Sequence, residues 1–295
     1  MNIFRRTLKF KYQFRTYFTQ PEQPSRHSLS NNTLKQRLQS NQPLVGMHTT
    51  MFGDTSHVEQ TAMLGYDFLF AEAEHSVASP ESIERLIIAA ERRGLPTLVR
   101  VGYGYQNIIG HIQKYLTSGA QGIILPQVES ARDVELLVEA VKFPPIGKRG
   151  LAGDRWNSWG LGEGGDMQQR VEDCNNNSII GVMIENQKGF DNLDAILKVE
   201  HLDFVSFGPT DISADLGVHG EIRHPDVVAM IEEGGKKIQA AGKATGTLVL
   251  NQEDYKYWRE QDFQVMYCVA QHIFVQGAQE LKNGMEDYEK NRRHR

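Results

Sequence analysis

The chain has 295 residues, of which 40% are hydrophobic and 23% charged, proportions that are typical of a globular protein. No run of 18 apolar residues occurs, which argues against insertion into a membrane. Two cysteines, Cys174 and Cys268, cannot form a disulfide framework, and they lack the Cys/His spacing of a zinc site. The formal net charge of −5 argues against nucleic acid as the main partner.

Residues 1–40 differ from the rest of the chain, because they carry eight Lys or Arg and a single acid, Glu22. The first 21 residues contain no acid at all, and aromatic and aliphatic side chains are interleaved with the cations. This pattern is typical of an organelle transit peptide. We predict that residues 1–40 form a flexible, basic mitochondrial transit peptide and linker, with the matrix as destination. A disordered basic tail on a cytoplasmic protein is the alternative.

Short, almost continuously apolar runs recur along the chain from Leu44 onward. Such runs are typical of parallel strands that are buried on both faces. Eight of them occur, at residues 44–48, 67–71, 96–101, 122–127, 179–185, 203–207, 244–249 and 264–269.

Segments with helical spacing of apolar residues follow these runs, as with Ile83, Leu86 and Ile87. Eight strand–helix units over about 250 residues predict an α/β (β/α)₈ TIM barrel spanning residues 41–295. A doubly wound open sheet is the alternative, but the turn after the first run lacks its G-x-G-x-x-G motif.

The connection between the fourth and fifth runs is unusually long. Residues 130–142 are predicted to form a helix, whereas residues 143–178 are rich in glycine and carry several cations and tryptophans. Loops of this length in compact domains are usually functional or disordered. We therefore expect a lid or a subunit contact, formed with Lys148, Arg149, Arg155, Trp156 and Trp159.

Polar and charged residues follow four of the predicted strands. Because the carboxyl ends of all strands of such a barrel meet at one mouth, we expect these side chains to converge there. Glu185 and Asp211 are oxygen ligands without a neighbouring Cys or His, which favours a hard cation such as Mg²⁺ or Mn²⁺. The other residues of this set are Glu72, Glu74, His75 and Arg100.

The turn Gly208-Pro209-Thr210-Asp211 precedes a short predicted helix. The backbone N–H groups of Thr210 and Asp211 are expected to face an anion such as a substrate carboxylate. Pro209 has no N–H group, so it shapes the turn and does not donate to the substrate.

Several runs of the sequence resemble the HpcH/HpaI family of metal-dependent 2-keto-acid aldolases, which have a (β/α)₈ fold. The resemblance spans about residues 34–285. It is carried by Ala73-Glu74-His75, Val99-Arg100, Gly147-Lys148-Arg149-Gly150, Ile184-Glu185 and the specific run from Gly208 to Gly217, GPTDISADLG.

The resemblance implies a role for each matching residue. Glu185 and Asp211 match the metal ligands, with Mg²⁺ expected first and Mn²⁺ or Co²⁺ as alternatives. Arg100 matches the arginine that contacts the keto oxygen and steadies the enolate, and His75 matches the histidine of the acid/base step. The turn at residues 208–211 matches the carboxylate contacts.

The implied activity is reversible cleavage of a 4-hydroxy-2-oxo acid to pyruvate, or a related 2-oxo acid, and an aldehyde through a metal-bound enolate. The expected partners are these small molecules and further copies of the chain, as dimers that can group into a hexamer. An oxaloacetate-type decarboxylase with the same site, or a non-catalytic metabolite-binding relative, is the alternative.

Three positions depart from the pattern of the better-known bacterial members. Glu72 stands where they have aspartate, and Met183 stands where they have glutamine. Thr117 stands where they have an aspartate that they lend to a histidine of a neighbouring subunit. Glu72 and Thr117 are therefore expected to support the site from its periphery, and the proton-transfer step is the part that these departures affect.

Overall fold

The computed structural model describes residues 33–49, 53–102, 105–161 and 166–293. Most of the predicted transit peptide, residues 1–32, lies outside the described residues, as do residues 50–52 of the first turn and residues 162–165 of the long connection.

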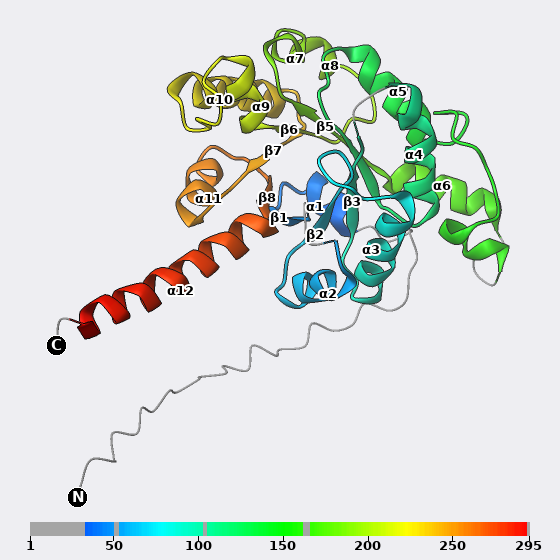
Figure 1. The fold of residues 1–295 in the computed structure, drawn as a ribbon. Coiled ribbons are helices and arrows are strands. Elements are labelled where there is room, and N and C mark those ends of the chain that lie inside the picture. Colours follow the sequence, from blue (N-terminus) through cyan, green and yellow to red (C-terminus); the bar gives the residue numbers. More distant parts are fainter. Residues whose placement is uncertain (1–32, 50–52, 103–104, 162–165, 294–295) are drawn as a thin grey trace, which may run out of the picture.

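The strands form a closed parallel barrel in the order β1 to β8, with β1 also paired to β8 (Figure 1). Each of the eight predicted runs overlaps one strand, and the ends agree to within two residues, so the predicted TIM barrel is confirmed. The strands are β1 Leu44–Thr49, β2 Phe68–Glu72, β3 Thr97–Arg100, β4 Gly122–Leu125, β5 Ile179–Ile184, β6 Phe204–Phe207, β7 Ala244–Leu248 and β8 Val265–Val269.

Helices surround the barrel and cover the outer faces of its strands (Figure 1). Among the described helices, none has both the length and the apolar character that a membrane span requires. The helices are α1 Thr33–Gln39, α2 Thr55–Met63, α3 Pro80–Arg92, α4 Tyr105–Thr117, α5 Ala131–Val141, α6 Met167–Asn177, α7 Gln187–Asp191, α8 Leu193–Ile196, α9 Pro209–Asp215, α10 Pro225–Ala240, α11 Gln252–Arg259 and α12 Ala270–Arg293.

Two apolar clusters follow from the alternation of side chains along the strands. Leu69 and Val99 face outward and pack against α3 and its neighbours, while Phe68, Phe70 and Leu98 fill the barrel interior. Gly46 makes room for the ring of Phe68, because a Cβ at position 46 would lie 2.3 Å from that ring. The interior is thus a packed core that supports the mouth from below.

Helix α1 closes the barrel at the end opposite the mouth. Its Leu34 and Leu38 are buried in the interior cluster. Lys35 forms an ion pair with Asp203 and donates to the carbonyl oxygen of Ser178 at 3.3 Å. Helix α1 therefore packs against the barrel, although the sequence analysis assigned its residues to the predicted leader and linker. The pattern missed α1 because only two of its seven residues are large and apolar.

The long connection after α5 is more structured than the sequence suggested. A 3₁₀-helix spans Arg155–Gly160, and α6 follows it. Trp156 packs with Phe143 and Cys174, and the Arg149 guanidinium lies 4.5 Å from the Phe143 ring centroid. These residues form a satellite core. Helix α6 was read as loop because it buries only Arg170 and Cys174 and so lacks an apolar periodicity.

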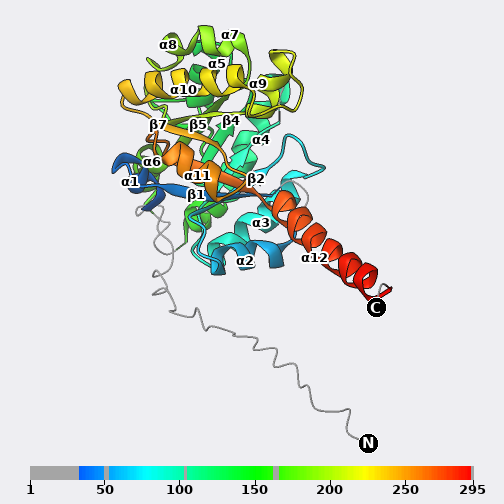
Figure 2. The ribbon, with the colours of Figure 1, turned by 90° about the vertical axis from the view of Figure 1, so that its left-hand side faces the viewer.

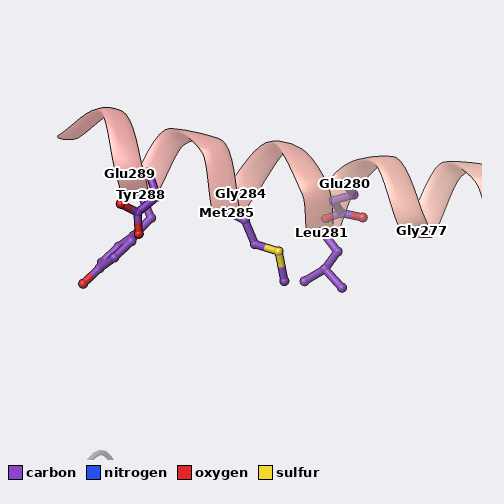
Figure 3. Close-up of a pocket in the computed structure, with 7 residues that line it drawn as sticks. All are labelled: Gly277, Glu280, Leu281, Gly284, Met285, Tyr288 and Glu289. Atoms are coloured by element: carbon purple, nitrogen blue, oxygen red, sulfur yellow. The ribbon is translucent and has the colours of Figure 1, made fainter. Parts of the chain in front are cut away.

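Helix α12 leaves the barrel after β8 and extends away from it (Figures 1 and 2). Every residue from His272 to Arg292 is exposed in the single chain. One of its faces carries Leu281, Met285 and Tyr288, which point to the same side of the helix (Figure 3). The residues around this apolar face all come from α12, and no other described element contributes to it.

Candidate active site

Four strands bring the predicted site residues to one mouth of the barrel. Glu72 is the last residue of β2, and Arg100 is the last residue of β3, directly opposite it in the strand register. Glu185 follows β5, and Gly208 follows β6. Since these strands are parallel, their carboxyl ends meet, and the expected convergence is observed.

Glu72 lies at the centre of the deepest part of the site, with a side chain that has no exposed surface. One of its oxygens, Oε2, accepts from Arg100 Nε at 2.7 Å and lies 2.6 Å from Arg100 Nη2. The same oxygen lies 2.6 Å from Nε2 of His48, on β1. Burial alone raises the pKa of Glu72, but the bond with His48 and the charge of Arg100 outweigh burial and bring the pKa to about 2.

The second oxygen of Glu72 holds the loop that follows β2. It accepts from the backbone N–H groups of Glu74 at 2.6 Å and His75 at 2.8 Å. The Ser76 hydroxyl donates to the Glu72 carbonyl at 2.7 Å. Glu72 therefore orients both the arginine and the loop that carries two further site residues.

Arg100 extends from this anchor toward the other acids. Its Nη1 lies 4.0 Å from Oε1 of Glu185 and donates to the sulfur of Met183 at 3.6 Å. Its Nε lies 3.4 Å from Oε2 of Glu74. The guanidinium thus binds Glu72 through Nε and Nη2, and its Nη1 is directed toward Glu185 at the mouth.

Glu185 is buried and is held from two sides. The backbone N–H of Gln127 donates to its Oε2 at 2.8 Å. Gln127 has a φ of 51°, a conformation that non-glycine residues rarely adopt. Gly208 leaves room for the carboxylate, because a Cβ at position 208 would lie 2.3 Å from Glu185 Oε1.

The acids around Glu185 carry more negative charge than Arg100 can balance. Burial raises the pKa of Glu185 to about 7, and Glu74 and Asp211 add to this shift. Burial likewise raises the pKa of Glu74 to about 7. Oε2 of Glu74 is buried and has no hydrogen-bond partner among the described residues. Two carboxylates with raised pKa values in one mouth fit a divalent cation, which would stabilise their ionised forms.

Glu185 and Asp211, the predicted ligands, lie close enough for Asp211 to contribute to the raised pKa of Glu185. Within the described residues, no three acidic, histidine or cysteine side chains come close enough together to enclose an ion. An ion held by these two carboxylates therefore keeps positions for water and substrate oxygens, as Mg²⁺ commonly does.

The predicted turn after β6 forms the start of α9, with Pro209 as the first helical residue and Gly208 as its N-cap. Gly208 offers no side chain to cap the helix. Pro209 is buried, Thr210 is exposed, and Asp211 is half-buried in the first turn. The turn therefore presents its first residues to the mouth beside Glu185.

The two histidines near Glu72 occupy different positions. His75, the predicted acid/base residue, lies at the rim with 54% of its side chain exposed and Nε2 3.6 Å from Glu74 Oε2. His48 lies below it, with 6% of its side chain exposed. The sequence analysis missed His48. Its place two residues after Gly46, on the inward-facing positions of β1, is the signal that could have revealed it.

Thr117 is not brought to the mouth of its own chain. It is the last residue of α4, which runs back along the outside of the barrel and ends near the start of β4. Its side chain lies near Asp154 and lowers the pKa of that carboxyl, which burial raises. Within one chain, Thr117 and His75 therefore lie at opposite ends of the barrel.

The arrangement defines a (β/α)₈ barrel with one fixed arginine in an acidic mouth, and comparisons with known proteins identify its family. The family model for HpcH/HpaI aldolase/citrate lyase matches residues 51–268. The chain belongs to this family, whose members are lyases and generally depend on a divalent metal.

Relatives with named activities match most of the chain. A hydroxypyruvate/pyruvate aldolase from Pseudomonas aeruginosa is 35% identical over 223 residues, covering 74% of this chain and 78% of the relative. A 4-hydroxy-2-oxo-heptane-1,7-dioate aldolase from Klebsiella pneumoniae is 31% identical over 235 residues, covering 78% and 84%. Both relatives are named as aldolases, which is the class of activity that the resemblance predicted.

Solved structures agree with the fold. An HpcH/HpaI aldolase/citrate lyase family protein from Burkholderia cenocepacia superposes with a TM-score of 0.79 at 26% identity, covering 87% of this chain and all of that one. The citrate synthase SbnG superposes with a TM-score of 0.76 at 28% identity, covering 89% and 100%.

The ionised Glu72 yields a prediction about stability and pH. Its pKa of about 2 lies below the unfolded value of about 4.5, so it stabilises the fold above pH 4.5 and loses this contribution as the pH falls toward 2. We expect Glu72→Gln to lower the free energy of unfolding by on the order of 3 kcal/mol at pH 6. Urea unfolding of both proteins from pH 6 to pH 3 measures this, and a pH-independent difference would contradict it.

Proposed function

We propose that the protein reversibly cleaves a 4-hydroxy-2-oxo acid into pyruvate, or a closely related 2-oxo acid, and an aldehyde. The observation that carries this proposal is the 4.0 Å approach of Arg100 Nη1 to the Glu185 carboxylate inside an acidic mouth. A cationic donor beside an oxygen-ligand cation site suits a substrate with adjacent carboxylate and ketone oxygens. Relatives named as pyruvate and 4-hydroxy-2-oxo-acid aldolases support the same substrate class.

Each residue has a task in this reaction. Glu185 and Asp211 hold the cation, proposed to be Mg²⁺, which when bound supplies Lewis acidity toward the ketone. Arg100 places a fixed positive charge where negative charge develops on the substrate oxygen. Because this charge is already in position, the site needs no rearrangement to stabilise the transition state. The turn at residues 208–211 receives the substrate carboxylate. His75, exposed at the rim, exchanges the proton with the aldehyde half of the substrate.

We further propose that residues 1–32 direct the protein to the mitochondrial matrix. Their support is the sequence pattern of cations without acids over the first 21 residues. Leu34 and Lys35 are buried against the barrel, so we expect the leader to be cleaved before them. Cleavage after Thr33 would remove residues of α1, which closes one end of the barrel.

We also propose that the chain works as a dimer-based homo-oligomer, with α12 as the contact. In a (β/α)₈ barrel the helix after the last strand normally packs in the outer ring. Here α12 leaves that place, and a cavity of about 300 Å³ remains beside Tyr255, Cys268 and Val269. An α12 from a second copy, with its face of Leu281, Met285 and Tyr288, has the apolar character to cover such surface (Figure 3).

Exchange of the pyruvate methyl hydrogens in D₂O tests the proposed function. We expect the wild-type protein to exchange them with Mg²⁺ or Mn²⁺ and to lose this activity with EDTA. Arg100→Lys keeps the charge but loses the forked geometry, so its rate should fall on the order of 10²-fold. Arg155→Lys, a matched change in an ion pair with Glu91 outside the mouth, should retain the rate.

A wild-type protein that binds pyruvate but exchanges no hydrogen would be a metabolite-binding relative and would overturn the proposal. If oxaloacetate loses CO₂ faster than any aldol product forms from pyruvate and a panel of aldehydes, the protein is a decarboxylase. The same aldehyde panel identifies the second substrate.

The dimer proposal predicts the effect of a charge on the apolar face of α12. Met285→Glu should shift the protein to the monomeric mass in light scattering, because the new carboxylate would be buried without a partner. Asn283→Glu adds the same charge at a neighbouring exposed position of α12 and should leave the assembly intact. A wild-type protein that is monomeric at micromolar concentration would contradict the proposal.

The leader proposal predicts a sharp boundary between two truncations. Residues 1–32 fused to a fluorescent protein should carry it into mitochondria, and the chain 33–295 should keep full activity. The chain 41–295 should lose on the order of 5–10 °C in thermal midpoint, since it lacks the buried Leu34 and Leu38. A fusion that stays in the cytosol argues against import.

A further inference from the structure

His48 is a buried polar residue that none of the site roles above includes. It lies near the end of β1 with its ring among interior aromatic side chains. The ring meets Phe70 edge-on at 4.6 Å between centroids and lies 6.1 Å from the Tyr267 ring. A buried imidazole in an aromatic setting is costly unless its polar atoms are used, so its contacts indicate its task.

The contacts of His48 fix which nitrogen carries a proton. Nε2 lies 2.6 Å from the Glu72 carboxylate, which is ionised and can only accept. Nε2 also lies 3.4 Å from Arg100 Nη2, which can only donate. The short contact with Glu72 therefore requires a hydrogen on Nε2. Burial lowers the pKa of His48, and a neutral ring with its proton on Nε2 meets this requirement without adding a charge.

His48 and Arg100 both contact the same oxygen of Glu72, and their nitrogens Nε2 and Nη2 lie 3.4 Å apart beside it. They stand on β1 and β3, the two neighbours of β2 in the barrel, and both reach Oε2. Oε1 of Glu72 is already held by the backbone N–H groups of Glu74 and His75. The donor on β1 gives Oε2 a second contact besides Arg100, and this contact fixes the oxygen to which the guanidinium is bound. Arg100 then has Nε and Nη2 engaged, and only Nη1 remains turned toward Met183 and Glu185.

We propose that His48 is a positioning residue for the reaction, which through Glu72 holds Arg100 with Nη1 directed at the developing charge of the substrate. The inference rests on the proposed function for its kinetic consequence, but its structural half concerns only His48, Glu72 and Arg100. This role also explains why β1, whose other inward-facing residues are Leu44 and Gly46, carries a histidine beside Glu72.

Three substitutions separate the hydrogen bond from the packing of the ring. His48→Phe keeps a ring against Phe70 but removes the donor, and His48→Leu removes both. His48→Gln removes the ring but keeps an amide N–H that can reach Glu72. Ile124→Val is the control, because Ile124 is an apolar residue of the same interior cluster.

The first readout is the steady-state rate of pyruvate methyl exchange. We expect His48→Phe and His48→Leu to lower kcat by 10- to 100-fold, the usual range for losing a residue that orients a catalytic group. KM for pyruvate should change less than threefold, because the cation ligands are untouched. His48→Gln should recover most of the rate, and Ile124→Val should stay within twofold of wild type.

The second readout does not depend on activity. The Nε–H resonance of Arg100, assigned by its absence in Arg100→Lys, should be protected from solvent exchange in the wild type and in His48→Gln. It should broaden or exchange faster in His48→Phe and His48→Leu. Loss of this protection supports the positioning role even if pyruvate proves not to be a substrate, so a failure of the proposed function is recognised separately.

Two results would overturn the inference. In the first, the Arg100 signal is unchanged in both His48→Phe and His48→Leu. In the second, His48→Gln is as slow as His48→Phe while both keep the wild-type thermal midpoint, which would mean that the imidazole itself takes part in proton transfer. If His48→Leu does not fold, His48→Phe and His48→Gln still decide between these outcomes.

Discussion

The buried Glu72 carboxylate is the interaction on which the rest of the site depends. It is withdrawn from water, yet its pKa lies at about 2 because donors surround it. One oxygen binds Arg100 and His48, and the other binds the backbone of the loop that carries Glu74 and His75. A single charge therefore orients the arginine and the rim of the mouth together. Removing its donors would leave an unpaired charge inside the barrel, which is strongly destabilising.

The same mouth holds carboxylates whose environment is the opposite of that of Glu72. Glu185 and Glu74 are buried, but Arg100 is already engaged, and burial raises their pKa values to about 7. Glu72 thus has enough donors within the protein to stay ionised, whereas Glu185 and Glu74 lack sufficient positive charge near them. A contrast of this kind between neighbouring acids is a common sign of assigned chemical roles. Here the contrast supports the proposal that Glu185 and Asp211 hold a divalent cation.

The sequence predicted the barrel well because strands buried on both faces must be apolar throughout, and residues after each strand must reach the same mouth. Glu72, Arg100 and Glu185 were found for that reason. His48 was missed because its partner Glu72 is 24 positions away and belongs to another strand, a relation that no local spacing records. Helices α1 and α6 were missed because their few buried side chains leave no helical period; tertiary contacts hold them in place.

The geometry also connects assembly with the mouth. Helix α12 begins at Ala270, directly after β8, and so leaves the barrel at the end where all strands direct their site residues. His75 lies at the same end with more than half of its side chain exposed. A second copy held along α12 would therefore lie close to the rim and could limit the access of water to it. Thr117 lies at the opposite end of its own barrel, near Asp154, and does not reach the histidine of its own chain. The departure at Thr117 therefore concerns the proposed assembly, whereas Glu72, Arg100 and Glu185 come together within one chain.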